Sequence, residues 1–275
     1  MLKISCLQLT SSDDIWNNIA KINELVAKSA SQGAQFVCTP ENSFLMEKPD
    51  TERILYTQNE HPAIRATAEM ARKNRVWLLI GSIAIADDRI QITGDRKSYN
   101  RSFLFNPEGE IAAQYDKIHL FDVEIDDGQT YRESTKIIPG NKVVLATTPW
   151  CKLGMTICYD LRFPQLYRSL AKAGAGIITV PAAFTRVTGA AHWHVLLRAR
   201  AIETGCFIIA PAQTGTHAGG RKTYGHSLII DPWGRILADA GAKQGIITAD
   251  IDLAEVAITR AKLPTLQHDR EFIYS

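Results

Sequence analysis

The sequence has few cysteines, no excess of one charge and no long apolar run. It contains five cysteines without a Cys-x-x-Cys pair, which argues against a disulfide framework and a zinc knuckle. Its 31 Lys and Arg residues balance 29 Asp and Glu to a net charge of +2, so nucleic acid is not an expected partner. The chain has no stretch of transmembrane length, and its N-terminus is too short and polar for a signal peptide. We therefore expect a cytoplasmic protein that acts on a small neutral or anionic molecule, away from membranes.

The chain also lacks internal repeats and any linker rich in Pro, Gly or Ser, so we predict a single domain over residues 1–275. Apolar runs rich in β-branched residues alternate with amphipathic segments, as in the α/β class. The predicted strands cover residues 3–9, 36–39, 76–85, 102–105, 110–115, 153–158, 176–181, 207–211, 227–230 and 245–251, and the predicted helices cover 13–31, 62–73, 163–173 and 191–205. Residues 106–109 and 231–234 have Pro and Gly in hairpin-turn positions, which indicates two mixed sheets with helices outside.

Cys158 is the most informative single residue. It closes the apolar run 153–158, and Pro164 follows at a position suited to the first turn of a helix. We expect a buried strand, a sharp turn and a helix, with a thiol that a ligand can reach and whose thiolate the helix dipole favours. Cys158 is therefore a candidate nucleophile, whereas the other cysteines are expected to be plain core residues or reduced thiols.

A nucleophilic thiol needs a base, and none of the seven histidines stands in an obviously catalytic setting. His192 and His194 favour a structural role over a metal site, because positions i and i+2 do not share a helix face and no third ligand is evident. Glu41 follows the apolar run 36–38 directly, where it is either a site carboxylate or a helix cap or paired surface acid. Lys117 stands between apolar residues, for which snorkelling to solvent is the simplest explanation.

Taken together, Glu41, Lys117 and Cys158 resemble the Glu-Lys-Cys triad of the nitrilase (carbon-nitrogen hydrolase) superfamily. The motifs are Pro-Glu at 40–41, Tyr-Asp-Lys-Ile-His-Leu-Phe at 115–121 and Gly-Met-Thr-Ile-Cys-Tyr-Asp-Leu-Arg-Phe-Pro at 154–164. The chain is most similar to the amidase branch that contains omega-amidase and deaminated glutathione amidase. The branch motifs lie at 132–134, 182–189, 191–203 and 224–227, and the stretch 224–234 is closest to deaminated glutathione amidases.

This resemblance implies a four-layer αββα sandwich of two mixed sheets with outer helices, and chemistry without a cofactor or metal. Glu41 would act as base and acid, and Cys158 would form a thioester as an amide is converted to an acid plus ammonia. The Lys117 ammonium and the backbone N–H of Tyr159 would bind the oxyanion. Glu133 resembles the second acid of the branch, which orients the lysine and the substrate or water; an exposed loop acid is the alternative.

Three further residues match substrate-binding positions of the branch. Arg162 resembles an arginine that grips a substrate carboxylate, although a salt bridge with Asp160 competes with that interpretation. Phe184 and Thr188 match pocket-lining positions, but on their own they would pass as a core residue and a loop residue.

The resemblance favours an amidase acting on a small carboxylate-bearing amide, with deaminated glutathione as the preferred substrate. One alternative is omega-amidase activity on 2-oxoglutaramate or 2-oxosuccinamate, and another is a non-catalytic binding or scaffold module. A redox-sensing thiol is a third, although Cys158 lacks an evident resolving cysteine in sequence. The resemblance also implies a homodimer, with higher homo-oligomers open, and the helices over 163–173 and 191–205 are the candidate interface.

Overall fold

Two six-stranded mixed sheets pack face to face in the computed structural model, which describes residues 1–48, 53–87, 97–125 and 130–273. The first sheet has the strand order β16-β1-β2-β3-β4-β5 and the second β15-β14-β11-β10-β9-β8. Each sheet has a parallel centre, β1-β2-β3 or β9-β10-β11, and antiparallel flanks.

The strand bounds of the first sheet are β1 (Leu2–Gln8), β2 (Phe36–Cys38), β3 (Trp77–Ala86), β4 (Ser98–Phe105), β5 (Ile111–Asp116) and β16 (Gly245–Ile251). Those of the second are β8 (Leu145–Thr147), β9 (Lys152–Met155), β10 (Ala175–Thr179), β11 (Phe207–Ala210), β14 (Leu228–Ile230) and β15 (Ile236–Asp239). Two small hairpins are formed by β6 (Asp122–Glu124) with β7 (Thr130–Arg132) and by β12 (Thr214–Thr216) with β13 (Lys222–Tyr224).

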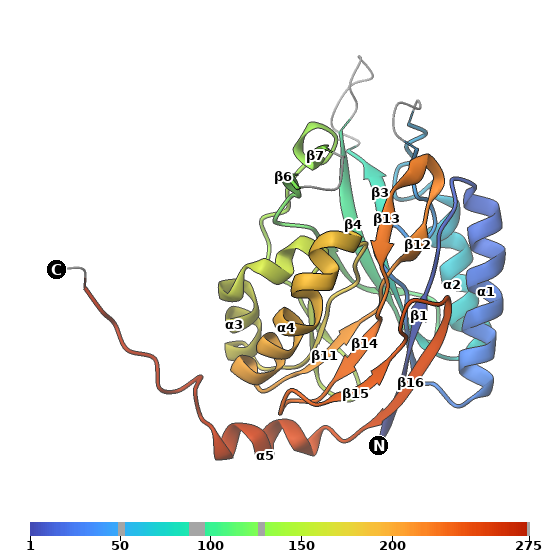
Figure 1. The fold of residues 1–275 in the computed structure, drawn as a ribbon. Helices are drawn as coiled ribbons and strands as arrows, with labels where there is room; N and C mark the ends of the chain where they lie inside the picture. The colour runs from blue at the N-terminus through green and yellow to red at the C-terminus, as the bar shows by residue number, and fades with distance from the viewer. Residues whose placement is uncertain (49–52, 88–96, 126–129, 274–275) are drawn as a thin grey trace.

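The helices form the outer layers. Figure 1 shows α1 (Ile15–Ser31) and α2 (Pro62–Asn74) on one side of the sheets and α3 (Pro164–Lys172) and α4 (Arg186–Thr204) on the other. A further helix, α5 (Ala254–Lys262), precedes a C-terminal tail that leads away from the body (Figure 1). None of the helices in the described part of the chain is long and apolar enough to cross a lipid bilayer.

Side-chain alternation along the strands explains the layers. Ile4 and Cys6 of β1 lie in the core cluster shared by the two sheets, whereas Leu7 lies in the cluster under α1 and α2. In β2, Phe36 and Cys38 face the other sheet and Val37 faces the helices. Because both faces of β2 are covered, every residue in its sequence is apolar.

The structure confirms the predicted αββα sandwich and both hairpin turns, which link β4 to β5 and β14 to β15. Two predicted boundaries near the site are wrong. The strand before Cys158 ends at Met155, and the thiol stands at the start of a short 3-10 turn, Cys158–Arg162. Helix α4 begins at Arg186 rather than 191, because the Thr185 side chain caps it, so His192 and His194 lie inside the helix and not at its start. Helix α5 was not predicted.

Candidate active site

Glu41, Lys117 and Cys158 meet in one cavity of about 410 Å³, a volume suited to a small molecule. Glu41 follows β2 and Lys117 follows β5 of the first sheet, while Cys158 follows β9 of the second. All three are buried, with exposed fractions of 3%, 2% and 6%. The site is thus built where the two sheets meet, from strand ends that are not neighbours in either sheet.

The Glu41 carboxylate is held from several directions. Its Oε1 accepts hydrogen bonds from Lys117 Nζ at 2.9 Å and from Asn100 Nδ2 at 3.0 Å. Its Oε2 accepts from the backbone N–H of Ala183 at 2.9 Å. Glu41 is therefore neither a helix cap nor a surface acid but a buried group fixed by both halves of the sandwich.

Lys117 bridges two carboxylates. Besides Glu41, its ammonium donates to Glu133 Oε1 at 3.0 Å and Oε2 at 2.8 Å. Glu133 also accepts from the backbone N–H of Phe121 at 2.7 Å and borders the cavity, so it is not a free loop acid. Since the Lys117 side chain is only 2% exposed, it does not snorkel to solvent.

Cys158 stands at a strained elbow. Its φ angle is 47°, in the left-handed region that costs a residue with a Cβ about 1–2 kcal/mol. The backbone leading into it is anchored: the Cys158 N–H donates to Pro181 O at 2.9 Å, and the Ile157 N–H donates to Asp160 Oδ2 at 2.9 Å. Asp160 is itself fixed by the Tyr115 hydroxyl at 2.7 Å. These contacts hold the thiol at the cavity wall.

Protonation in this cluster differs from the sequence-based expectation. Burial and the neighbouring Glu41 charge raise the pKa of the Cys158 thiol well above its usual range, so the helix dipole does not yield a resting thiolate. Burial alone would raise the pKa of Glu41, but the Lys117 ammonium, a hydrogen bond with Cys158 and the Arg221 charge lower it overall. The resting pair is a thiol beside a carboxylate, which is the arrangement a general base requires.

The predicted substrate-binding residues fall into two groups. Phe184, Thr188 and Tyr159 line the cavity, and Tyr159 directly follows the thiol in a turn whose first N–H groups have no partner within the turn. Arg162 is not among the lining residues. Its guanidinium lies 5.3 Å from the Phe184 ring centroid and 3.4 Å from His192 Nδ1.

The alternative salt bridge of Arg162 is also absent from the described residues. Asp160 instead accepts hydrogen bonds from the backbone N–H of His119 at 3.0 Å, from Ile157 and from Tyr115. The role of Arg162 toward substrate stays a prediction.

Two cavity residues were missed from sequence. Asn100, in β4, donates to both Glu41 and Glu133, at 3.0 and 3.3 Å, and Arg221 borders the cavity just before β13. Neither stands next to a recognisable motif residue of the triad. A polar side chain inside an otherwise apolar strand, as at Asn100, is the one signal that could have indicated the first.

One group in the described part of the chain could hold a metal ion: His194, His226 and Asp239. Two of its ligands, His226 and Asp239, come from segments distant from His194 in sequence, which sequence spacing could not reveal. The imidazoles already hydrogen-bond to Asp239, at 3.2 Å from His194 and 3.0 Å from His226, so the group is satisfied without an ion. None of the three residues borders the cavity that holds Cys158.

Gly81 of β3 lets the loop before Glu41 approach closely. A Cβ at this position would lie 2.2 Å from Thr39 O and 2.3 Å from Pro40 O, which are backbone atoms that cannot turn aside. We expect Gly81→Ala to lower the thermal midpoint by about 5–10 °C, since overpacking costs about 1–3 kcal/mol or more. Gly245→Ala in β16 is the control, because its Cβ would meet nothing within 4 Å. Equal melting temperatures for the two variants, measured by circular dichroism, would contradict this interpretation.

Comparison with known proteins supports these observations. The carbon-nitrogen hydrolase family matches residues 3–261. Deaminated glutathione amidase of Synechocystis sp. is 43% identical over 272 residues, covering 96% of each chain, and that of Yersinia enterocolitica is 42% identical, covering 97% of this chain and 92% of the relative. The crystal structure of the C. elegans NitFhit protein superposes with a TM-score of 0.86 at 33% identity. The match covers 98% of this chain but 65% of that one.

The family match spans nearly the whole chain. The two bacterial relatives carry the name of an amidase, and this chain covers almost all of their length. The chain shares its fold with the NitFhit structure. In this chain, the cavity lies where the two sheets of the sandwich meet. The chain belongs to the carbon-nitrogen hydrolase family and is a hydrolytic amidase.

Proposed function

We propose that the chain hydrolyses the amide bond of a small carboxylate-bearing substrate through a thioester on Cys158. The observation that carries the proposal is the convergence of a thiol, a carboxylate and an ammonium, Cys158, Glu41 and Lys117, in one cavity. Because all three side chains are buried, the interactions between their charges are stronger than they would be in water.

The proposed cycle uses one proton carrier. Glu41 takes the Cys158 proton as the sulfur attacks the amide carbon, and the carbonyl oxygen becomes an oxyanion near the Lys117 ammonium and the Tyr159 N–H. Glu41 then returns the proton to the departing nitrogen as the carbon–nitrogen bond breaks. Water next loses a proton to Glu41 and attacks the thioester, which releases the acid and restores the thiol. Glu133 is the positioning residue that holds Lys117 in place.

Deaminated glutathione is the substrate we favour, because the two bacterial relatives carry its name. It is a peptide-like amide without a primary carboxamide, so its leaving group is the amine of cysteinylglycine. The expected release of ammonia is therefore wrong for this substrate and applies only to 2-oxoglutaramate or 2-oxosuccinamate. This difference gives the two substrate proposals separate products.

The test compares the two substrates at equal concentration. We expect deaminated glutathione to yield 2-oxoglutarate and cysteinylglycine with a kcat/KM at least about tenfold above that for ammonia release from 2-oxoglutaramate. The reverse ratio would establish an omega-amidase. If neither substrate reacts faster with the wild-type protein than with Cys158→Ala, both substrate proposals fail.

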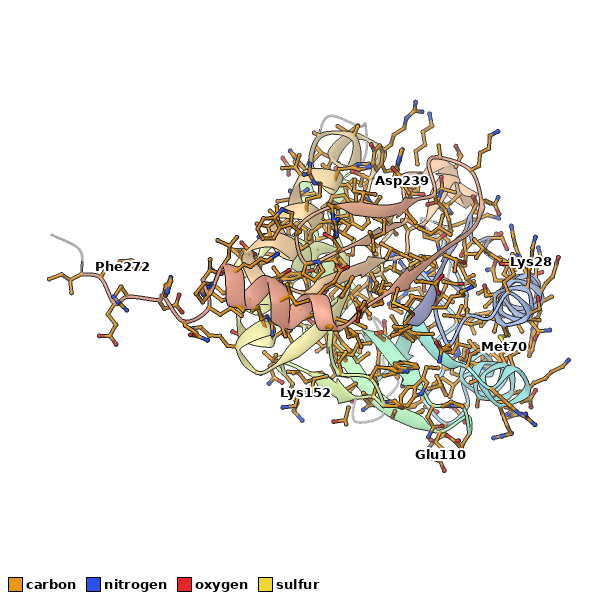
Figure 2. All side chains as sticks on the ribbon, turned by 90° about the horizontal axis from the view of Figure 1, so that it is seen from below. Lys28, Met70, Glu110, Lys152, Asp239 and Phe272 are labelled. Atoms are coloured by element: carbon orange, nitrogen blue, oxygen red, sulfur yellow. The ribbon has the colours of Figure 1, made fainter. Side chains whose placement is uncertain are left out.

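We also propose that the chain forms a homodimer through its α3 and α4 side. Large apolar side chains there are open to solvent, including Val195 and Ile202 on α4 and Ile258 on α5. The C-terminal tail also presents a large apolar side chain to solvent: Phe272 lies away from the body (Figure 2) and is 80% exposed. Gel filtration with light scattering at micromolar concentration is the test, and a monomer mass would overturn the proposal.

A further inference from the structure

The cluster of His194, His226 and Asp239 lies outside the cavity and brings together three side chains that can bind a metal ion. His194 lies in α4, His226 stands two residues before β14, and Asp239, labelled in Figure 2, is the last residue of β15. The three side chains are 29%, 26% and 33% exposed, so an ion can reach them from solvent.

The spacing of the ligand atoms matches the face of a tetrahedral site. Asp239 Oδ2 lies 3.2 Å from His194 Nε2 and 3.2 Å from His226 Nδ1. Zinc bonds of about 2.0–2.1 Å place neighbouring ligands of a tetrahedron about 3.3–3.4 Å apart. The two nitrogens lie within 4.8 Å of each other, so a small turn of one ring completes the face. A water molecule would take the fourth position.

Surrounding contacts fix the orientation of the ligands. Asp239 Oδ1 accepts a hydrogen bond from the Gly241 N–H at 2.8 Å, which directs Oδ2 toward the two rings. The His226 N–H donates to Gly241 O at 2.7 Å, and the His226 carbonyl accepts from Trp193 Nε1 at 2.7 Å. The His226 ring stacks on Tyr224, with centroids 4.5 Å apart. Outer contacts of this kind orient metal ligands and strengthen metal binding.

The hydrogen bonds within the cluster satisfy it without an ion, and an ion would replace them at the same atoms. A neutral imidazole can carry its proton on either ring nitrogen, so the nitrogen that faces Asp239 can become a ligand. Among the described residues, Asp239 pairs with the two imidazoles and with no lysine or arginine that an ion would have to displace. His192, considered from sequence together with His194, lies outside the cluster, and its Nδ1 is 3.4 Å from Arg162.

We propose that His194, His226 and Asp239 bind a divalent transition-metal ion of the Zn²⁺ type, which ties α4 to the β14–β15 hairpin. Two imidazole nitrogens and one carboxylate oxygen are a donor set that suits Zn²⁺. Mg²⁺ and Ca²⁺ prefer oxygen ligands alone. The role assigned to the ion is structural, because the cluster does not border the cavity that holds Cys158.

Titration calorimetry on the full chain, freed of metal with a chelator, tests the site. The parent is Cys158→Ala, which lacks the cavity thiol as a competing zinc ligand. We expect one Zn²⁺ to bind per chain and Mg²⁺ to show no binding at the same concentrations. His194→Gln should weaken Zn²⁺ binding at least about tenfold, since the loss of even an outer partner of a metal ligand costs about 10-fold to 100-fold. His226→Asn should do the same, and asparagine tolerates the φ of 53° at this position.

His192→Gln is the matched control, because His192 is an exposed histidine of the same helix; its affinity for Zn²⁺ should stay within about twofold of the parent's. At about 100 times the parent's Kd, Zn²⁺ should raise the parent's thermal midpoint by about 5–10 °C and that of His194→Gln by at most about half as much.

Absence of Zn²⁺ binding to the parent would overturn the proposal. So would an affinity that stays unchanged in the ligand variants, which would place the ion elsewhere, or one that falls equally in His192→Gln. If one ligand variant unfolds, the other decides alone.

Discussion

Replacing Cys158 with alanine is expected to lower kcat for amide hydrolysis by at least about 10,000-fold, because the proposed thioester cannot form and the remaining groups act only through binding and the oxyanion site. The change removes one sulfur atom from a cavity wall, so the fold should persist. The measurement is product release under saturating substrate, with circular dichroism to verify folding.

Cys151→Ala is the control for this substitution. Cys151 is half-buried, burial raises the pKa of its thiol to about 11, and it does not border the cavity. Its variant should retain activity within about twofold, as expected for a residue away from the chemistry. Activity above about 1% of wild type in Cys158→Ala would rule out the thioester route.

Glu41→Gln should reduce kcat by about 100-fold to 10,000-fold, the range that a general base supplies. The amide keeps the shape and the hydrogen bond that its oxygen accepts from Lys117, but it cannot take the thiol proton. Because the pKa of Cys158 is raised, the thiol then stays protonated at neutral pH, and alkylation of Cys158 by iodoacetamide should slow in parallel. Peptide mapping after a timed reaction measures this rate.

The matched control is Glu69→Gln on the exposed face of α2, for which both rates should equal those of wild type. The labelling experiment also distinguishes an enzyme from a scaffold of the same fold. In a scaffold, Cys158 would be alkylated no faster than the other cysteines, and Glu41→Gln would change nothing.

Local sequence patterns predicted the parts of the site that each lie on one segment. The apolar run that Cys158 closes indicated a nucleophile at a strand end, where a buried chain reaches a ligand. The local pattern left Glu41 open between a site acid and a cap or surface acid and favoured snorkelling for Lys117, so these two were assigned to the site only through the family resemblance. Asn100 and Arg221 could not be found this way. Their importance depends on which neighbours the folded chain brings to them, and Arg221 comes from a hairpin more than 60 residues after the thiol.

Electrostatics was the weaker part of the sequence-based prediction. A helix N-terminus next to Cys158 suggested a lowered pKa, but complete burial and the charge of Glu41 act more strongly in the opposite direction. Burial alone would raise the pKa of Glu41, and the Lys117 ammonium reverses that. The charges responsible at both residues lie 40 or more residues away in sequence, so no local pattern could have indicated them.

The division of the cavity between the two sheets has a consequence for how the protein loses activity. The base and the ammonium belong to one sheet and the thiol to the other. Each sheet alone would carry an ordinary lysine, glutamate or cysteine, so the reactive thiol exists only while the sandwich is closed. Hydrolysis therefore requires that the two sheets stay packed together. In a denaturant series, activity should be lost at or below the denaturant concentration at which the helical circular dichroism signal is lost.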